Sequence, residues 1–277
     1  MTVTPATTSG GRAGRNLPAA TAVGIGLLAL VWGSLYYVRP VFIGIAMAAA
    51  FFAVRELSNA LATRGRSVVR EVAYPASLLI PAVAYVFSAD ISLGLFALTI
   101  VVVAALRLRN GIEGYFDDLA ASVLVIAYVP LLVGFATAMS AGDHGAQRVI
   151  TMILLTAGND TGGYATGVFF GRHPIAPTIS PKKSWEGLAG SLITQALLGA
   201  FVVPLLLDIS AWQGVALGLA MSVTATIGDY AESAIKRDLG VKDMSQALPG
   251  HGGFMDRLDS LLINALVAWI AFTWMGV

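Results

Sequence analysis

The chain contains no cysteine, which excludes disulfide bonds, thiolate metal sites and cysteine nucleophiles. Charged residues are also scarce, at 12% of 277 residues, and the net charge at neutral pH is only +1. A charge this small does not suggest a nucleic-acid partner. By contrast, 57% of the residues are hydrophobic, more than the roughly 45–50% of an ordinary soluble domain. We therefore expect an integral membrane protein.

Long polar stretches are absent as well. Outside the apolar windows no segment exceeds about 25 residues, which is short of the ~50 that a globular domain typically needs. Residues 1–17 are rich in Thr, Gly, Ala and Ser and are expected to form a disordered cytoplasmic tail. Residues 18–277 are expected to form a single transmembrane domain. The chain contains thirty glycines, many of them scattered through the apolar windows, where small residues allow close packing of membrane helices.

Nine apolar windows are long enough to predict membrane helices, which need about 20 residues each. They span 18–38, 40–57, 72–88, 91–108, 118–140, 147–170, 185–206, 211–233 and 258–276. Only Arg39-Pro40 separates the first two windows, so one long bent helix, and eight spans in total, is the alternative. The predicted fold is all-α and polytopic, with about nine transmembrane helices.

The distribution of basic residues favours nine spans. If the amino terminus is cytoplasmic, fifteen of the seventeen lysines and arginines fall in the tail and loops of the cytoplasmic side, and only Arg39 and Arg148 lie outside. Eight spans would divide these basic loops between the two sides of the membrane. We therefore predict a cytoplasmic amino terminus and a carboxyl terminus that faces outward.

Polar residues gather at the end of the eighth window, at the spacing of one helical face: Asp229, Glu232, Ser233 and Lys236. A carboxylate at the edge of hydrocarbon is costly, so these side chains should face the protein interior or water rather than lipid. A purely structural ion pair between Glu232 and Lys236 is the alternative interpretation.

A glycine-containing loop follows and leads into the ninth window. It ends in Pro249-Gly-His-Gly-Gly253, and backbone N–H groups at such a helix start predict an anion site. Asp256 and Asp259 then lie on one helical side. Carboxylate oxygens without cysteine favour Mg²⁺. The neighbouring basic residues suit phosphate: Lys236, Arg237, Lys242 and Arg257.

A second polar block lies earlier, on the same predicted side of the membrane. Asn159-Asp160 interrupts an apolar window, and Lys182-Lys183 lies in the next loop. Asp160 could instead be a buried polar residue that joins helices, and the lysines could be ordinary cytoplasmic charge beside the interface residue Trp185. We expect Asp160 and the two lysines to form further walls of one site with the block at residues 233–259.

The two blocks resemble the signature of the phosphatidate cytidylyltransferases over about residues 157–260. The matching residues are Asp160 to Tyr164, Ser180-Pro-Lys-Lys-Ser-Trp-Glu-Gly187, Ser233-x-x-Lys-Arg237, Lys242-Asp243 and His251-Gly-Gly-x-x-Asp-Arg-x-Asp259. Two positions depart from the family pattern, Gly163 in place of a common Ala and Ser184 in place of a common Thr. Both are mild changes that leave the hydroxyl at residue 184 in place.

The resemblance implies a polytopic enzyme of phospholipid biosynthesis, often a homodimer, that uses CTP and phosphatidate and requires a divalent cation. Its metal-associated aspartates correspond to Asp229 and Asp256, for Mg²⁺, with a second cation left open. The expected catalytic residues are Lys236, Arg237, Lys242, Asp243, His251, Arg257 and Asp259. The expected substrate-binding residues are Asp160, Lys182, Lys183, Ser233, Gly252 and Gly253. His251 could bind phosphate, assist proton transfer or stabilise the turn. The implied location is the inner membrane, with the active site on the cytoplasmic side.

Three other functions compete with this interpretation. A cation or proton transporter could use intramembrane carboxylates, but the first half shows no second copy of the polar block. A CTP-using lipid kinase would give lipid phosphate and CDP as products. A CDP-alcohol phosphotransferase would be expected to carry an Asp-Gly-x-x-Ala-Arg motif, which the chain lacks.

Overall fold

The computed structural model describes residues 17–245, 247 and 252–277. In this part the α-helices are α1 (Leu17–Tyr37), α2 (Arg39–Ala62), α3 (Arg70–Val86), α4 (Ala89–Arg107), α5 (Tyr115–Ile126), α6 (Leu132–Met139), α7 (Gly145–Phe170), α8 (Trp185–Phe201), α9 (Val203–Leu207), α10 (Ala211–Leu239) and α11 (Met255–Met275). A 3₁₀ turn (Leu108–Asn110) extends α4, and a π-helical turn (Ala127–Leu131) joins α5 to α6. The all-α prediction is confirmed. Of the expected tail, residues 1–16 lie outside the described residues, and Leu17 already belongs to α1.

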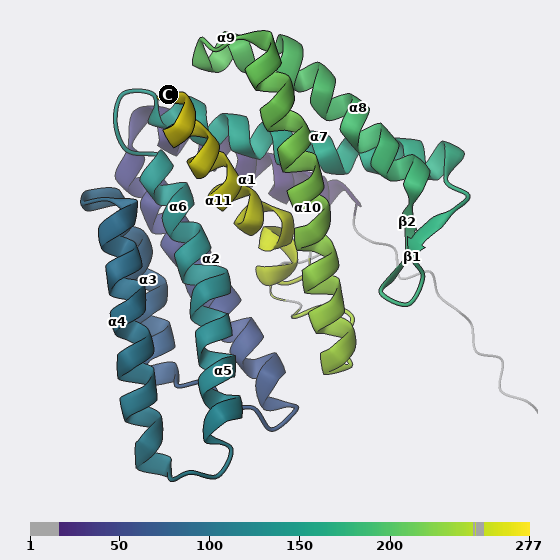
Figure 1. The fold of residues 1–277 in the computed structure, drawn as a ribbon. Coiled ribbons are helices and arrows are strands. Elements are labelled where there is room, and N and C mark those ends of the chain that lie inside the picture. Colours follow the sequence, from purple (N-terminus) through teal and green to yellow (C-terminus); the bar gives the residue numbers. More distant parts are fainter. Residues whose placement is uncertain (1–16, 246, 248–251) are drawn as a thin grey trace, which may run out of the picture.

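The helices form two groups that meet at α11 (Figure 1). On one side α3 packs against α2, α4 and α6, and on the other side α8 packs against both α7 and α10. Helix α11 contacts α10 and α6, so the end of the chain joins the two groups. The polar blocks of the sequence therefore belong to α7, the loop before α8, α10 and α11, and α10 contacts α7, α8 and α11.

The helices cover all nine apolar windows. The break between the first two lies at Val38, whose φ of −146° is not helical, and Pro40 is in the first turn of α2. Within the described residues, five helical segments are long and apolar enough to cross a membrane: Arg39–Ala62, Ala89–Asn110, Tyr115–Met139, Ala211–Leu239 and Met255–Met275. The protein is therefore a multi-pass membrane protein, and the count of nine spans stays a prediction. Helices α3 and α8 have only 17 residues each.

Glycines allow the helices of the second group to approach closely. A Cβ atom built on Gly214 of α10 would lie 2.0 Å from the carbonyl oxygen of Gly199 on α8. One turn further along α10, a Cβ on Gly218 would lie 2.5 Å from the carbonyl oxygen of Gln195. The expected role of small residues is confirmed at these positions, because any side chain would push the two backbones apart.

The loop between α7 and α8 forms a β-hairpin that the sequence did not predict. Strand β1 (Pro174–Ala176) pairs antiparallel with β2 (Ser180–Ser184), with Pro174 opposite Ser184. The hairpin leads directly into α8, because the Ser184 hydroxyl accepts a hydrogen bond from the Gly187 N–H and caps the helix. This arrangement holds Lys182 and Lys183 on a strand at the start of α8.

Candidate functional site

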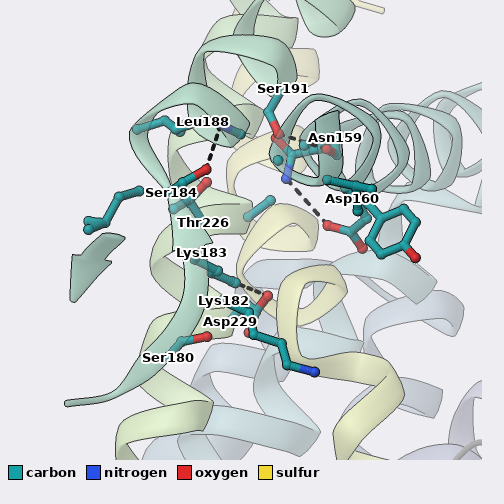
Figure 2. A pocket seen from close by; sticks show the side chains of 17 residues that line it. Asn159, Asp160, Ser180, Lys182, Lys183, Ser184, Leu188, Ser191, Thr226 and Asp229 are labelled. Atoms are coloured by element: carbon teal, nitrogen blue, oxygen red, sulfur yellow. Dashed lines mark hydrogen bonds and ion pairs between the residues drawn. The ribbon is translucent and has the colours of Figure 1, made fainter. Parts of the chain in front are cut away.

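A cavity of about 540 Å³ lies between α7, α8, the hairpin and α10 (Figure 2). Four of the predicted site residues line it: Asp160, Lys182, Lys183 and Asp229. Hydroxyl groups of the hairpin, α8 and α10 add to its polar lining: Ser180, Ser184, Ser191 and Thr226. The rest of the wall is largely apolar, with Tyr164, Val168, Ile175 and Leu188. The cavity therefore brings Asp229 together with Asp160 and the two lysines, while no described residue of 233–259 is among those that line it, so a single site with that block stays a prediction. The apolar wall is a feature that the sequence did not indicate.

Asp229 is the acidic centre of this cavity. Its carboxylate forms an ion pair with the Lys183 ammonium group, which reaches from the hairpin to α10. The Lys183 nitrogen also lies 4.7 Å from the centroid of the Tyr230 ring, within the range of a cation–π contact. The other Asp229 oxygen accepts a long hydrogen bond of 3.4 Å from the Ser233 hydroxyl, one helical turn away. Asp229 is thus held by α10 itself and by the hairpin.

Asn159 connects three helices beneath the cavity. It is 5% exposed, and its side-chain oxygen accepts a hydrogen bond from Ser222 of α10 at 2.7 Å. Its backbone oxygen accepts from the Ser191 hydroxyl of α8, also at 2.7 Å, and its amide group donates to Asp160 at 3.3 Å. The role of a buried residue that joins helices therefore falls to Asn159, while Asp160 is exposed and lines the cavity.

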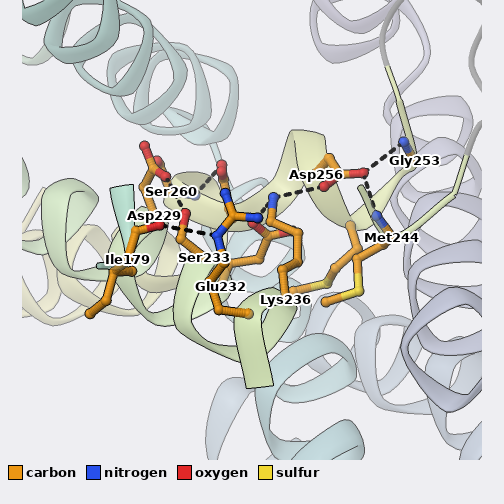
Figure 3. A network of polar contacts seen from close by, with 12 residues as sticks. Ile179, Asp229, Glu232, Ser233, Lys236, Met244, Gly253, Asp256 and Ser260 are labelled. Carbon is orange, nitrogen blue, oxygen red and sulfur yellow. Dashed lines mark hydrogen bonds and ion pairs between the residues drawn. The ribbon is translucent and has the colours of Figure 1, made fainter. Parts of the chain in front are cut away.

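Lys236 is the centre of a second polar cluster, formed with Glu232 and Asp256 and called here the Lys236 cluster (Figure 3). The Lys236 ammonium group pairs with Glu232 on its own helix and donates to Oδ1 of Asp256 at 2.8 Å. The other Asp256 oxygen accepts from the N–H groups of Met244, at 3.0 Å, and Gly253, at 2.9 Å. The Glu232–Lys236 ion pair, which the sequence offered as the alternative interpretation, is present, and it extends to the aspartate of α11.

Other predicted residues make fewer contacts with these two centres. Arg237 donates to the carbonyl oxygen of Ile179 at 3.3 Å and so connects α10 to the hairpin. Asp259 accepts from the N–H of Ser260 at 2.6 Å. Gly252 has a φ of +84°, which favours glycine. Lys242, Asp243 and Arg257 are exposed, as is Arg237. His251 lies outside the described residues.

Three helices, α7, α10 and α11, each bring an aspartate to this region. Asp160, Asp229 and Asp259 interact electrostatically with one another. Among the described residues, however, no three His, Cys, Asp or Glu side chains gather closely enough to form a metal site by themselves. Mg²⁺ commonly binds through one or two carboxylates plus substrate phosphates. The oxygen donors present fit that mode, and the assignment of Asp229 and Asp256 as metal ligands stays a prediction.

Sequence reasoning missed Glu56, on α2. This side chain is 7% exposed, and its carboxylate accepts from the Ser245 hydroxyl at 2.5 Å and from the N–H groups of Phe254, at 3.1 Å, and Met255, at 2.9 Å. It therefore contacts both the segment after α10 and the start of α11. The available signal was a carboxylate inside an apolar window, which needs a partner.

Comparisons with known proteins show the family of this chain. Residues 18–275 match the model of the cytidylyltransferase family. A phosphatidate cytidylyltransferase of Mycobacterium leprae is 36% identical over 95% of this chain and 89% of its own length. Its counterparts in Mycobacterium bovis and Mycobacterium tuberculosis (strain H37Rv) are each 37% identical over 95% of this chain, and over 90% and 84% of their own lengths. The chain therefore belongs to the cytidylyltransferase family.

Proposed function

We propose that this protein transfers the cytidylyl group of CTP to phosphatidate and so forms CDP-diacylglycerol and pyrophosphate for phospholipid biosynthesis. The observation that carries the proposal is the likeness to phosphatidate cytidylyltransferases along 95% of the chain. The cavity supports it, because lysines and an aspartate line one part and apolar side chains line another. An amphipathic lipid phosphate and a charged nucleotide need such a combination.

The chemistry requires cations more than a strong base. A phosphate oxygen of phosphatidate attacks the α-phosphorus of CTP, and the bond from that phosphorus to the bridging oxygen breaks as pyrophosphate leaves. The attacking group is already an anion near neutrality, because a phosphate monoester has a second pKa of about 6. The barrier instead comes from repulsion between two polyanions and from charge on the leaving group, which fixed cations relieve.

The cavity supplies these cations from the hairpin. Lys182 is exposed at its edge, and Lys183 reaches into it toward Asp229. We assign both lysines to a substrate phosphate, of either the nucleotide or the lipid. The ion pair with Asp229 then serves to hold the Lys183 ammonium group in the cavity before the phosphate arrives.

Asp229 and Asp256 are the proposed holders of Mg²⁺, with Asp160 and Asp259 as further candidates near the first. The bound cation supplies charge neutralisation of the phosphates and of the leaving pyrophosphate. Phosphates are gripped by Lys236, Arg237, Lys242 and Arg257. Lys236 is already oriented for this role by Glu232 and Asp256.

The apolar wall of the cavity is the proposed place of the phosphatidate acyl chains. Tyr164 and Val168 on α7 line the cavity and are 76% and 61% exposed, which leaves them accessible to acyl chains. A lipid could thus enter from the bilayer while its phosphate meets the lysines of the hairpin. CTP would reach the same cavity from the aqueous side.

The proposed topology follows the basic residues. Nine spans and a cytoplasmic amino terminus would place the hairpin, the end of α10 and the start of α11 on the cytoplasmic side of the inner membrane, where CTP is available. A homodimer in this membrane is part of the same proposal, since the family it resembles is often dimeric.

The decisive experiment uses the purified protein in detergent with cytidine-labelled CTP, Mg²⁺ and phosphatidate. We expect a lipid-soluble labelled product and one equivalent of pyrophosphate, both dependent on phosphatidate. No labelled lipid with phosphatidate, together with lipid phosphate and CDP when a polyprenol-type alcohol is supplied, would instead identify a lipid kinase.

A further inference from the structure

Two carboxylates accept hydrogen bonds from the backbone N–H groups at the start of α11, and each binds different N–H groups. Asp256 accepts from the Gly253 N–H, and Glu56 of α2 accepts from the N–H groups of Phe254 and Met255. The first N–H groups of a helix have no partner within the helix, and negative charge is favourable there. Hydrogen bonds from N–H to an ionised carboxylate are also stronger than neutral ones. Glu56 therefore caps a helix that begins about two hundred residues later in the chain.

The same carboxylate holds the segment before α11. Ser245 donates to Oε1 of Glu56 at 2.5 Å, and Met244, one residue earlier, donates its N–H to Asp256. Glu56 and Asp256 thus fix neighbouring residues on this segment as well as neighbouring residues at the helix start. A substitution at Glu56 should therefore change the position of Asp256, although the two side chains belong to different helices.

Gly253 shows how closely Glu56 fits. A Cβ atom at this position would lie 2.5 Å from Oε2 of Glu56 and 3.0 Å from Oε1. Gly253 is absent from the glycines with positive φ, so its backbone conformation would accept another residue. The obstacle to a side chain is the Glu56 carboxylate. One turn earlier on α2, Phe52 stacks on Phe254 with ring centroids 4.9 Å apart, which adds an apolar contact to the same junction.

We propose that Glu56 is a positioning residue of the active site, which orients Asp256 toward Lys236 by holding the start of α11 and the segment at Ser245. The anion preference expected at this helix start is then satisfied by a carboxylate of the chain itself. The proposal rests on the proposed cytidylyltransferase function for its activity measurements, and it extends the site to α2, outside the residues of the family signature.

The first test compares Glu56→Gln with Ser58→Ala. A glutamine keeps the size of the side chain, but it offers one acceptor oxygen and turns an NH₂ group toward backbone donors. Ser58 is also fully buried on α2, so its truncation controls for disturbance of that helix. We expect Glu56→Gln to lower kcat at least tenfold. We also expect it to raise the Mg²⁺ midpoint, which is the Mg²⁺ concentration that gives half of the maximal increase in Tm, at least tenfold. Ser58→Ala should change both values less than twofold.

Other outcomes of this comparison are equally informative. If Glu56→Gln lowers Tm but leaves kcat and the Mg²⁺ midpoint unchanged, Glu56 is only structural and the proposal is wrong. If the wild-type protein makes no cytidine lipid, the proposed function fails, while the coupling of Glu56 to the helix start is still tested by the thermal measurements on the variants below.

The second test is a double-mutant cycle between Gly253→Ala and Glu56→Ala, read in kcat/KM and in Tm. If the Glu56 carboxylate is what requires glycine at position 253, Gly253→Ala should cost at least tenfold in kcat/KM in the wild-type background. It should cost less than twofold once Glu56 has been truncated. The Tm loss caused by Gly253→Ala should shrink in the same way. Equal losses in both backgrounds would overturn the proposal, because the glycine would then serve something other than Glu56.

Discussion

Both carboxylate oxygens of Asp256 accept hydrogen bonds from other parts of the chain. One oxygen receives the Lys236 ammonium group and the other receives two backbone N–H groups, from Met244 and Gly253. The side chain therefore links α10, the segment after it and α11. Lys236 also pairs with the fully buried Glu232. Loss of the charge at Asp256 would therefore leave Lys236 with Glu232 as its remaining carboxylate partner in the Lys236 cluster.

We predict that Asp256→Asn lowers kcat at least about a hundredfold while the protein still inserts and purifies normally. Asparagine keeps the shape and one acceptor oxygen but removes the charge that Lys236 and a bound cation require, and even the residues that support metal ligands are typically worth about 10–100-fold. The measurement is liponucleotide formation at saturating CTP and phosphatidate over a range of Mg²⁺ concentrations.

Asp117→Asn is the matched control for this variant. Asp117 is an exposed aspartate in the first turn of α5, so its replacement removes the same favourable interaction with a helix start, about 0.3–1 kcal/mol, away from the site. Its activity should stay within twofold of wild type. Near wild-type activity of Asp256→Asn with Mg²⁺ would remove Asp256 from the proposed metal site.

Helical spacing was enough to predict the local contacts of α10. Asp229 and Ser233 are four residues apart, as are Glu232 and Lys236, and both pairs are in contact. The contacts of Asp229 with Lys183 and of Glu56 with Met255 could not be predicted in this way, because they join residues 46 and 199 positions apart. Such pairs depend on how whole helices pack, which a local pattern does not specify.

At the scale of elements, helix windows were predictable and the connections between them were not. Hydrophobic length located each helix, but the hairpin has only three and five residues in its strands, too few for an alternating pattern to stand out. The short helix α9 likewise begins beside Pro204, at a point where the hydrophobicity of the window continues without interruption. These connections matter for the site, since the hairpin carries Lys182 and Lys183.

The crossing of α8 and α10 is the element contact most sensitive to substitution. We predict that Gly214→Ala lowers the free energy of unfolding by about 1–3 kcal/mol, because its Cβ would lie 2.0 Å from the Gly199 carbonyl oxygen, a backbone atom that cannot rotate away. Tm in detergent should fall by roughly 5 °C. The cavity lies between the same helices, so activity should fall with stability.

Gly44→Ala controls for the general effect of alanine in a helix. Gly44 is exposed on α2, and a Cβ built there meets no atom within 4 Å. Alanine is a better helix former than glycine, so this variant should be as stable as wild type or slightly more stable. If Gly214→Ala behaves like Gly44→Ala, the close approach of α8 and α10 is not a constraint on the protein.

At the scale of the whole molecule, topology decides whether both substrates can reach one cavity. The hairpin carries Lys182 and Lys183, and the end of α10 carries Lys236 and Arg237. The positive-inside rule assigns basic segments of this kind to the cytoplasm. An even number of spans would leave the carboxyl terminus on the side of the amino terminus. An odd number separates the two ends. With the amino terminus in the cytoplasm, the location of Val277 therefore distinguishes nine spans from eight.

We predict that a reporter active only in the cytoplasm stays silent when fused after Val277, because the nine-span topology places this residue outside. The same reporter fused after Lys242, beyond the end of α10, should be active, and it shows that the fusion itself is tolerated. A reporter active only outside should give the opposite pattern at both positions. Strong cytoplasmic activity at Val277 would overturn the nine-span topology, and a silent Lys242 fusion beside it would indicate eight spans with a cytoplasmic amino terminus.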